Sequence, residues 1–169
     1  MVSAHVTTRA LDGHDFASPI DDRWFEDYRH GETFEYGWTS LTSEEIVEYA
    51  VRYDPQRIHT DPEWARSGPF GGLIASGWQS AGLMMRLYCD HYISAAASLG
   101  SPGVDELRWS SPLRPDVPVR LRVTVAEARV SRSKPDRGLV HTEVALLTED
   151  DRCPLRLTAM NLLLVRPPR

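Results

Sequence analysis

Residues that can exchange a proton lie just ahead of a glycine-rich turn in the stretch YDPQRIHTDPEWARSGPFGGLIASGW, residues 53–78. Asp54 is followed five residues later by His59, in a segment that Pro55 and Pro62 bracket and that we therefore expect to be a loop. A carboxylate and an imidazole that face one water molecule can divide the work, one holding the water while the other exchanges its proton. The alternative is structural, because capping aspartates and hydrogen-bonded loop histidines are common.

The turn GPFGG and the following LIASGW could serve a second chemical purpose. Glycines ahead of a helix expose backbone N–H groups at its positive end, which suits a developing oxyanion or a phosphate. The alternative is close packing of the helix start against a sheet. Ser76 and Ser80 do not fit the pattern G-x-S-x-G, so a serine hydrolase is disfavoured.

The sequence lacks the residues that metal sites and nucleotide-binding sites require. His59 and Asp61 have no neighbouring set of metal ligands, and Cys89 and Cys153 have no metal-ligand spacing, so we expect no metal site and two free thiols. The chain has neither G-x-G-x-x-G nor a phosphate-binding P-loop, which argues against a bound dinucleotide or nucleoside triphosphate.

Charge and length set broader limits. The 169 residues are 41% hydrophobic, enough for one domain, and the net charge of −5 disfavours a nucleic-acid partner. The segment ARVSRSKPDRG is a basic hairpin end, where Arg132 and Lys134 are candidates for contacts with substrate phosphates if the substrate carries any. We find neither a signal-peptide pattern nor an apolar run of eighteen residues, and so expect a cytoplasmic protein with no membrane contact.

The first half of the chain should place Asp54 at the exit of a helix. Residues 1–19 are polar and irregular, and we expect a flexible N-terminal arm ahead of a single domain over residues 20–169. A strand is predicted over residues 33–40, and a helix over 42–53 begins with a capping box, Thr42 and Glu45. Pro55 ends that helix. A second short helix should start at Asp61 as its N-cap.

The second half predicts the overall architecture. From residue 73 to about residue 98 there is no proline, and apolar residues cover most of the helical wheel, so this helix should be enclosed on most sides. Four strand-like segments follow, separated by short turns. The pattern predicts an α+β fold in which an antiparallel sheet wraps around a long central helix.

With these features together, the chain resembles the MaoC-like dehydratase family of the hot-dog fold, which includes the (R)-specific enoyl-CoA hydratases. The match to the hydratase signature consists of Asp54, Ile58, His59 and Ala65. The glycine of the family's I-[AV]-H-G element is Gly77. The chain departs from the family at Tyr53, Gln56, Arg57, Ser76 and Met85, where a small residue, Asn, Pro, His and Ser are usual.

The resemblance implies reversible hydration of a trans-2-enoyl thioester to the 3-hydroxyacyl thioester, as in fatty acid metabolism, without metal or organic cofactor. Asp54 and His59 would bind one water, and the Gly77 N–H would stabilise the enolate oxygen. Coenzyme A or an acyl carrier protein would enter as part of the substrate, bound between the subunits of a homodimer or of a larger assembly of dimers. Candidate substrate-binding residues, besides the hairpin pair, are Gln56, Arg57, Phe70, Ser76 and Trp78.

Two other functions remain open at this point. A hot-dog thioesterase would use similar parts to hydrolyse the thioester, and a non-catalytic subunit would only bind it. Arg57 beside the histidine hints at a carboxylated acyl chain, although an ordinary surface arginine is the simpler interpretation.

Overall fold

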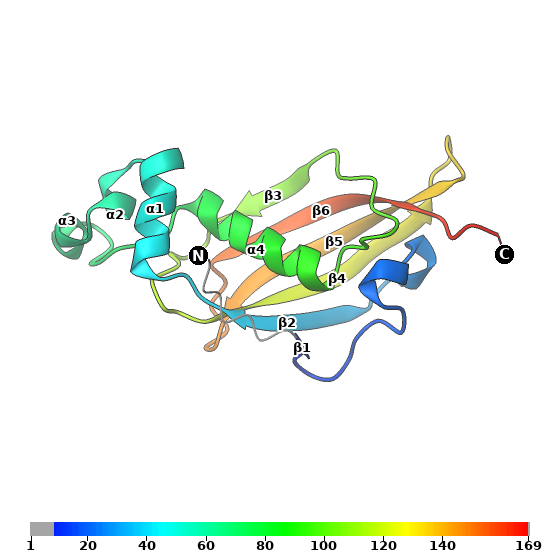
Figure 1. Ribbon diagram of the computed structural model, residues 1–169, viewed down its shortest axis with the longest axis horizontal. Helices are drawn as coiled ribbons and strands as arrows, with labels where there is room; N and C mark the ends of the chain where they lie inside the picture. Colours follow the sequence, from blue (N-terminus) through cyan, green and yellow to red (C-terminus); the bar gives the residue numbers. More distant parts are fainter. Residues whose placement is uncertain (1–8, 169) are drawn as a thin grey trace.

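Six strands form one antiparallel sheet in the structure, a computed structural model that describes residues 9–168 (Figure 1). The sheet order is β1-β2-β4-β5-β6-β3, so the two halves of the chain share one sheet. The strands are β1 (Arg9–Ala10), β2 (Thr33–Thr39), β3 (Val104–Arg108), β4 (Val119–Val130), β5 (Arg137–Thr148) and β6 (Leu155–Leu164). The α-helices are α1 (Ser43–Tyr53), α2 (Arg57–Thr60), α3 (Pro62–Ser67) and α4 (Gly77–His91), with short 3-10 turns at Ile20–Asp22 and Phe25–Asp27. The predicted α+β class is confirmed.

Helix α1 begins and ends as its sequence predicts. The Glu45 N–H donates to the Thr42 hydroxyl at 3.2 Å, and the Glu45 carboxylate accepts from the Thr42 N–H at 2.8 Å. Helix α3 likewise starts after Asp61, whose carboxylate accepts from the Trp64 N–H at 2.9 Å. These caps satisfy N–H groups that have no partner inside a helix.

The predicted loop between the two prolines is a short helix instead. Residues Arg57–Thr60 form α2, with Gln56 as the N-cap residue. Its backbone is helical because the Thr60 N–H donates to the Gln56 carbonyl at 3.1 Å and the Asp61 N–H donates to the Arg57 carbonyl at 3.1 Å. A single helical turn is too short to show a period of 3.6 residues in sequence, which explains the difference.

The central helix is shorter than the apolar stretch that predicts it. Ser76 is the N-cap of α4 in an extended conformation, and the preceding residues leave the helix because the Ala75 N–H donates to the Leu113 carbonyl at 2.8 Å. At the other end, the buried Arg23 guanidinium donates to the His91 and Tyr92 carbonyls at 2.7 and 2.8 Å. Cations at a helix C-terminus satisfy its free carbonyls, so this contact fixes where α4 stops.

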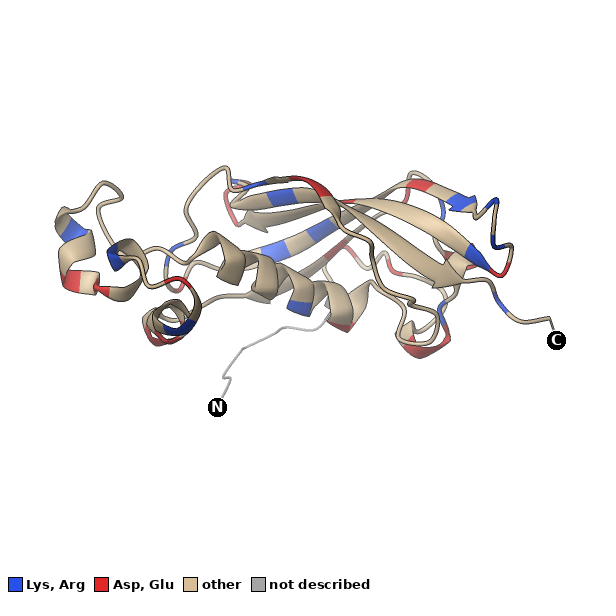
Figure 2. Ribbon diagram, turned by 90° about the horizontal axis from the view of Figure 1, so that it is seen from above, with Lys and Arg blue, Asp and Glu red and all other residues tan. Residues whose placement is uncertain are grey.

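Helix α4 lies against one face of the sheet, as the view from above shows (Figure 2). Its buried face contributes Met84, Leu87 and Tyr88 to a core that includes alternate residues of β4, β5 and β6. On its other side Trp78 is 60% exposed and Met85 46% exposed. Enclosure of the helix on most sides is therefore not achieved by one chain.

Four buried polar side chains between α4 and the sheet are hydrogen-bonded in pairs. The Asn161 amide donates to the Tyr88 hydroxyl at 2.8 Å, and the Tyr92 and Thr142 hydroxyls are 2.8 Å apart. Burial of a polar group is costly unless a partner replaces water, and these pairs meet that condition.

Residues 9–19 differ from the flexible arm that their composition predicts. Strand β1 pairs with β2, and the Phe16 ring stacks on Phe34 with centroids 4.1 Å apart. Apolar Phe16 thus anchors the segment to the core. Residues 1–8 of the predicted arm lie outside the described residues, and the division at residue 19 stays a prediction.

Candidate active site

Asp54 lies where α1 ends, because Pro55 prevents the helix from continuing. Its N–H still donates to the Ala50 carbonyl at 2.9 Å, while its own backbone has left helical geometry with φ −152° and ψ 68°. The side chain is therefore carried on a rigid helix but directed out of it. It is 18% exposed.

His59 is held by α2 and by the segment that precedes α4. Its side chain is 6% exposed, and Nδ1 is 2.8 Å from the Ile74 carbonyl oxygen. Because a carbonyl only accepts, Nδ1 carries the hydrogen, and in a neutral ring Nε2 is then an acceptor. Nε2 faces Asp54 Oδ2 at 3.5 Å, too far for a direct hydrogen bond.

The Asp54 carboxylate is fixed by two donors. The Ser76 hydroxyl donates to Oδ2 at 2.6 Å, and the Gln56 amide donates to Oδ1 at 2.7 Å. These hydrogen bonds, that from Ser76 first, hold the pKa of the Asp54 carboxyl below its ordinary value because they favour the charged form. The nearby His59 also lowers this pKa, and partial burial opposes the change.

Gly77 begins α4 beside this pair. The first N–H groups of a helix have no intrahelical acceptor, and that of Gly77 has none among residues 9–168. Its carbonyl accepts from the Trp109 indole N–H at 2.9 Å, and a Cβ on Gly77 would lie 2.5 Å from Trp109 Cε2. Only glycine fits under the indole ring without a shift of Trp109.

A cavity of about 330 Å³ brings these groups together. Asp54, His59 and Gly77 line it, beside an apolar wall that the N-terminal turn of α4 and the segment after β3 form. Trp78 and Trp109 meet at one side with ring centroids 5.2 Å apart. The remaining lining residues are Gln56, Phe70, Ile74, Ala75, Ser80, Ser111, Pro112, Leu113 and Pro154. Paired acceptors, a free N–H and an apolar wall suit proton transfer on a substrate that is partly apolar.

The structure brings together most, but not all, of the predicted substrate-binding residues. Gln56, Phe70 and Trp78 line the cavity. Ser76 does not, because it is fully buried behind Asp54. Arg57 lies outside the cavity lining too, since its guanidinium pairs with Asp61 at 3.0 Å and lies over the Trp64 ring. These local partners favour the interpretation of Arg57 as an ordinary surface arginine.

Arg132 and Lys134 lie at the tip of the β4–β5 hairpin, at the opposite end of the sheet from α1, α2 and α3 (Figure 1). Each of these strands has twelve residues, which spans about 40 Å. One chain therefore does not bring this pair to its own cavity, and a contact with substrate phosphates stays a prediction.

Sequence reasoning missed Trp109, Ser111, Pro112 and Leu113. They follow β3, which pairs with β6 at the edge of the sheet, and Ala75 is hydrogen-bonded to this segment through Leu113. A tryptophan after a strand-like run was the only local signal. The Arg114 guanidinium also donates to the Phe70 carbonyl and so ties the glycine-rich turn to the same segment.

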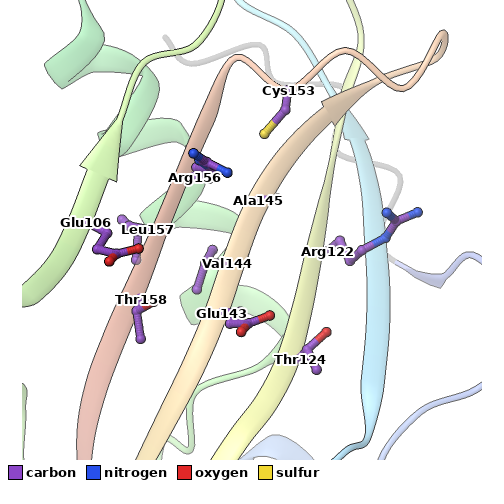
Figure 3. A pocket seen from close by; sticks show the side chains of 10 residues that line it. All are labelled: Glu106, Arg122, Thr124, Glu143, Val144, Ala145, Cys153, Arg156, Leu157 and Thr158. Carbon is purple, nitrogen blue, oxygen red and sulfur yellow. The ribbon is translucent and has the colours of Figure 1, made fainter.

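A second cavity of the same volume, about 330 Å³, lies on the sheet face that α4 does not cover (Figure 3). It is lined by carboxylates and guanidinium groups, among them Glu106, Glu143, Arg122 and Arg156. Arg122 is already paired with Glu35 at 2.5 Å, and no histidine lines the cavity. Burial raises the pKa of the Cys153 thiol there. The cavity with Asp54 and His59 is thus the better candidate for chemistry.

Other features bear on the remaining expectations. Cys89 and Cys153 are free thiols, as predicted. Within residues 9–168 there is no group of three or more His, Cys, Asp or Glu side chains that could hold a metal ion. Over the same residues, no helix has the length and apolar character needed to cross a membrane.

Comparisons with known proteins show the family and the fold of the chain. The family model described as MaoC like domain matches residues 26–146. A 3-hydroxyacyl-thioester dehydratase of Mycobacterium tuberculosis is 33% identical over 114 residues, 66% of this chain and 73% of that protein. The crystal structure of a MaoC-like dehydratase from Rhodospirillum rubrum matches with TM-score 0.80 and 32% identity, over 86% of this chain and 99% of that one. A Mycobacterium tuberculosis protein with a double hotdog fold matches at TM-score 0.71 and 16% identity, over 90% and 47% of the two chains, which concerns the fold alone. The protein therefore has the predicted hot-dog fold and belongs to the MaoC-like dehydratase family.

Proposed function

We propose that the protein catalyses reversible hydration of a trans-2-enoyl thioester to a 3-hydroxyacyl thioester. The observation that carries this proposal is the pair of acceptors, Asp54 Oδ2 and His59 Nε2, 3.5 Å apart at the wall of a cavity. One water can donate one hydrogen to each acceptor. Its oxygen lone pairs are then free to attack carbon.

The two acceptors divide the work unequally. Asp54 accepts hydrogen bonds from Ser76 and Gln56, and these stabilise its charged form, so it is a weak proton acceptor that orients the water. His59 Nε2 takes the proton from the water while the water oxygen forms a bond to C3. The C2–C3 double-bond electrons move to give an enolate, and the proton then passes from Nε2 to C2.

The enolate oxygen needs a donor that is already in position. The Gly77 N–H, at the positive end of α4, supplies it. Asp54, His59 and Gly77 line one cavity, so in this proposal C3 of the substrate would lie near the acid–base pair and the thioester carbonyl near the Gly77 N–H. Coenzyme A or an acyl carrier protein enters only as part of the substrate, and no metal or organic cofactor takes part.

A second copy of the chain completes the site in this proposal. Trp78 and Met85 are exposed apolar residues on α4, and β3 leaves one edge of the sheet without a neighbouring strand in the described chain. Exposed apolar side chains and a free strand edge are features that protein association covers. A homodimer built on this face would enclose α4 and bring a partner's residues to the thioester.

The test follows absorbance of the enoyl thioester after purified protein is added to crotonyl-CoA, with free thiol measured in parallel. Loss of absorbance without thiol release supports a hydratase. Thiol release would instead mean a thioesterase. A lack of change with crotonyl-CoA and with longer, branched and carboxylated analogues would favour a binding subunit.

Asp54→Asn tests the assignment of residues. The amide of this variant has one acceptor oxygen in place of two, so it cannot accept from Ser76, from Gln56 and from the water as the carboxylate does. We expect turnover to fall by at least about a hundredfold with the fold intact. Asp90→Asn is the matched control, since Asp90 pairs with Arg86 near the far end of α4. Full activity in Asp54→Asn would remove the mechanism.

A further inference from the structure

Ser76 occupies a position between the acid–base pair and helix α4. It has 0% of its surface exposed and does not line the cavity, so it cannot touch a substrate held there. Its hydroxyl is nevertheless 2.6 Å from Asp54 Oδ2, across 22 residues of chain. Any effect of Ser76 on the reaction must therefore act through another group.

The hydroxyl of Ser76 has two partners at once. It donates its one hydrogen to Asp54 Oδ2, and it accepts from the Trp78 N–H at 3.2 Å. A hydroxyl has a single donor and two acceptor lone pairs, so its donor capacity is fully used by the carboxylate. The same oxygen thus links Asp54 to the first turn of α4, where Gly77 lies.

The segment Ile74–Ser76 also sets the geometry between the two acceptors. The Ile74 carbonyl accepts from His59 Nδ1 at 2.8 Å, and two residues later Ser76 holds Asp54. Between them, the Ala75 N–H donates to the Leu113 carbonyl at 2.8 Å. One short piece of backbone thus holds both members of the pair: His59 through the Ile74 carbonyl and Asp54 through the Ser76 hydroxyl. The Ala75 contact fixes that piece of backbone to the segment after β3.

We infer that Ser76 is a positioning residue, which holds Asp54 Oδ2 towards His59 Nε2 and fixes the carboxylate relative to the Gly77 N–H. The inference rests on the proposed function and adds to it a residue that does not contact the substrate. Gln56 holds the other carboxylate oxygen from the exposed side, so Ser76 is the buried member of the two supports.

The test uses three substitutions at one position. Ser76→Ala removes the hydroxyl, Ser76→Thr keeps it, and Ser76→Gly removes it while largely preserving N-cap preference. We expect kcat of the alanine and glycine variants to fall by about tenfold or more, with KM within about twofold, because the carboxylate loses a charge-assisted hydrogen bond that only positions it. Ser76→Thr should restore most of kcat.

A second readout does not depend on turnover. The titration of the Asp54 carboxyl is followed by carbon-13 NMR, with the signal assigned by its loss in Asp54→Asn. Its midpoint should lie at higher pH in Ser76→Ala than in the wild type, and should return in Ser76→Thr. Thr42→Ala is the matched control, because it removes the N-cap hydroxyl of α1 without touching Asp54, and should leave kcat unchanged.

The outcomes separate this inference from the proposed function. An unchanged carboxyl titration or a wild-type kcat in Ser76→Ala overturns the positioning role even if the wild type is a hydratase. A wild-type protein that hydrates no enoyl thioester overturns both the proposed function and the role in it, while the NMR titration still reports whether Ser76 lowers the pKa of Asp54. A loss of kcat in Thr42→Ala equal to that in Ser76→Ala would mean that helix capping alone is responsible.

Discussion

Replacement of Gly77 by alanine tests the close contact between α4 and Trp109. A Cβ at this position would lie 2.5 Å from Trp109 Cε2 and 2.7 Å from Cδ2 and Nε1. Real Cβ atoms do not approach a ring so closely, so the indole must move. That movement breaks the hydrogen bond from the Trp109 indole to the Gly77 carbonyl.

The size of the effect follows from these contacts. Overpacking costs about 1–3 kcal/mol, and a lost hydrogen bond about 0.5–1.5 kcal/mol. Trp109 is 45% exposed and can turn towards solvent, which reduces the first cost. We expect Gly77→Ala to lower the free energy of unfolding by about 1–2 kcal/mol, and to lower turnover by about 10–100-fold because the displaced ring changes the cavity wall next to the reacting atoms.

The assay compares four variants with the wild type by urea unfolding and by hydration of crotonyl-CoA. Gly82→Ala is the stability control within the same helix, because a Cβ there meets nothing within 4 Å in the chain, and it should stabilise the fold by about 0.5–1 kcal/mol. Gly77→Ala, Trp109→Ala and their combination complete a double-mutant cycle. The clash predicts that the double variant is more stable than the sum of the single effects by at least about 0.5 kcal/mol. Additive effects, or a Gly77→Ala protein as stable and active as the wild type, would refute the reasoning.

Two further predictions concern stability. Asp54 has a lowered pKa in the folded protein because Ser76 and Gln56 donate to it, so it stabilises the fold above the ordinary aspartate pKa of about 3.9, and this contribution is lost as pH falls through the folded pKa. The difference in the free energy of unfolding between wild type and Asp54→Asn should therefore be present at pH 7 and shrink at pH 3; a constant difference would contradict it. Asn161→Ala removes the donor to the buried Tyr88 hydroxyl and should cost about 1–3 kcal/mol in urea unfolding, more than Met160→Ala on the other face of β6.

Local signals predicted two of the elements that carry the site, α1 and the central helix, but not α2, which holds His59. The capping box at Thr42 and Glu45 located α1, and Pro55 located its end, so the placement of Asp54 at a helix exit was predictable. The apolar stretch located the central helix but not its ends. The ends of the helix depend on contacts with residues distant in sequence: Arg23 binds the carbonyls at its C-terminus, and Leu113 binds Ala75 just before its N-terminus.

The partners of the site residues could not be predicted in the same way. Ser76 contacts Asp54 across 22 residues, and Trp109 contacts Gly77 across 32 residues. Neither separation falls within a single helix or strand, so no local period signals the contact, and both contacts depend on how distant segments pack in the fold. Proximity in sequence also misled, because Arg57 is two residues from His59 but is paired with Asp61, outside the cavity lining.

The strand order has a consequence for how the site comes into being. Strands β2 and β4 are neighbours in the sheet, and Thr33 and Thr124, whose hydroxyls are 2.8 Å apart, are separated by 91 residues. All of α1 to α4, and with them Asp54, His59, Ser76 and Gly77, lie in the segment between these two strands. Closure of a long segment costs chain entropy before its contacts form, so local helices can precede it but the cavity cannot. The segment with the acid–base pair is therefore not a separable module: cut out of the chain, it would retain the reactive side chains with Trp109 and Leu113, but lose Pro154 from the cavity wall and the strands β4, β5 and β6 against which α4 packs.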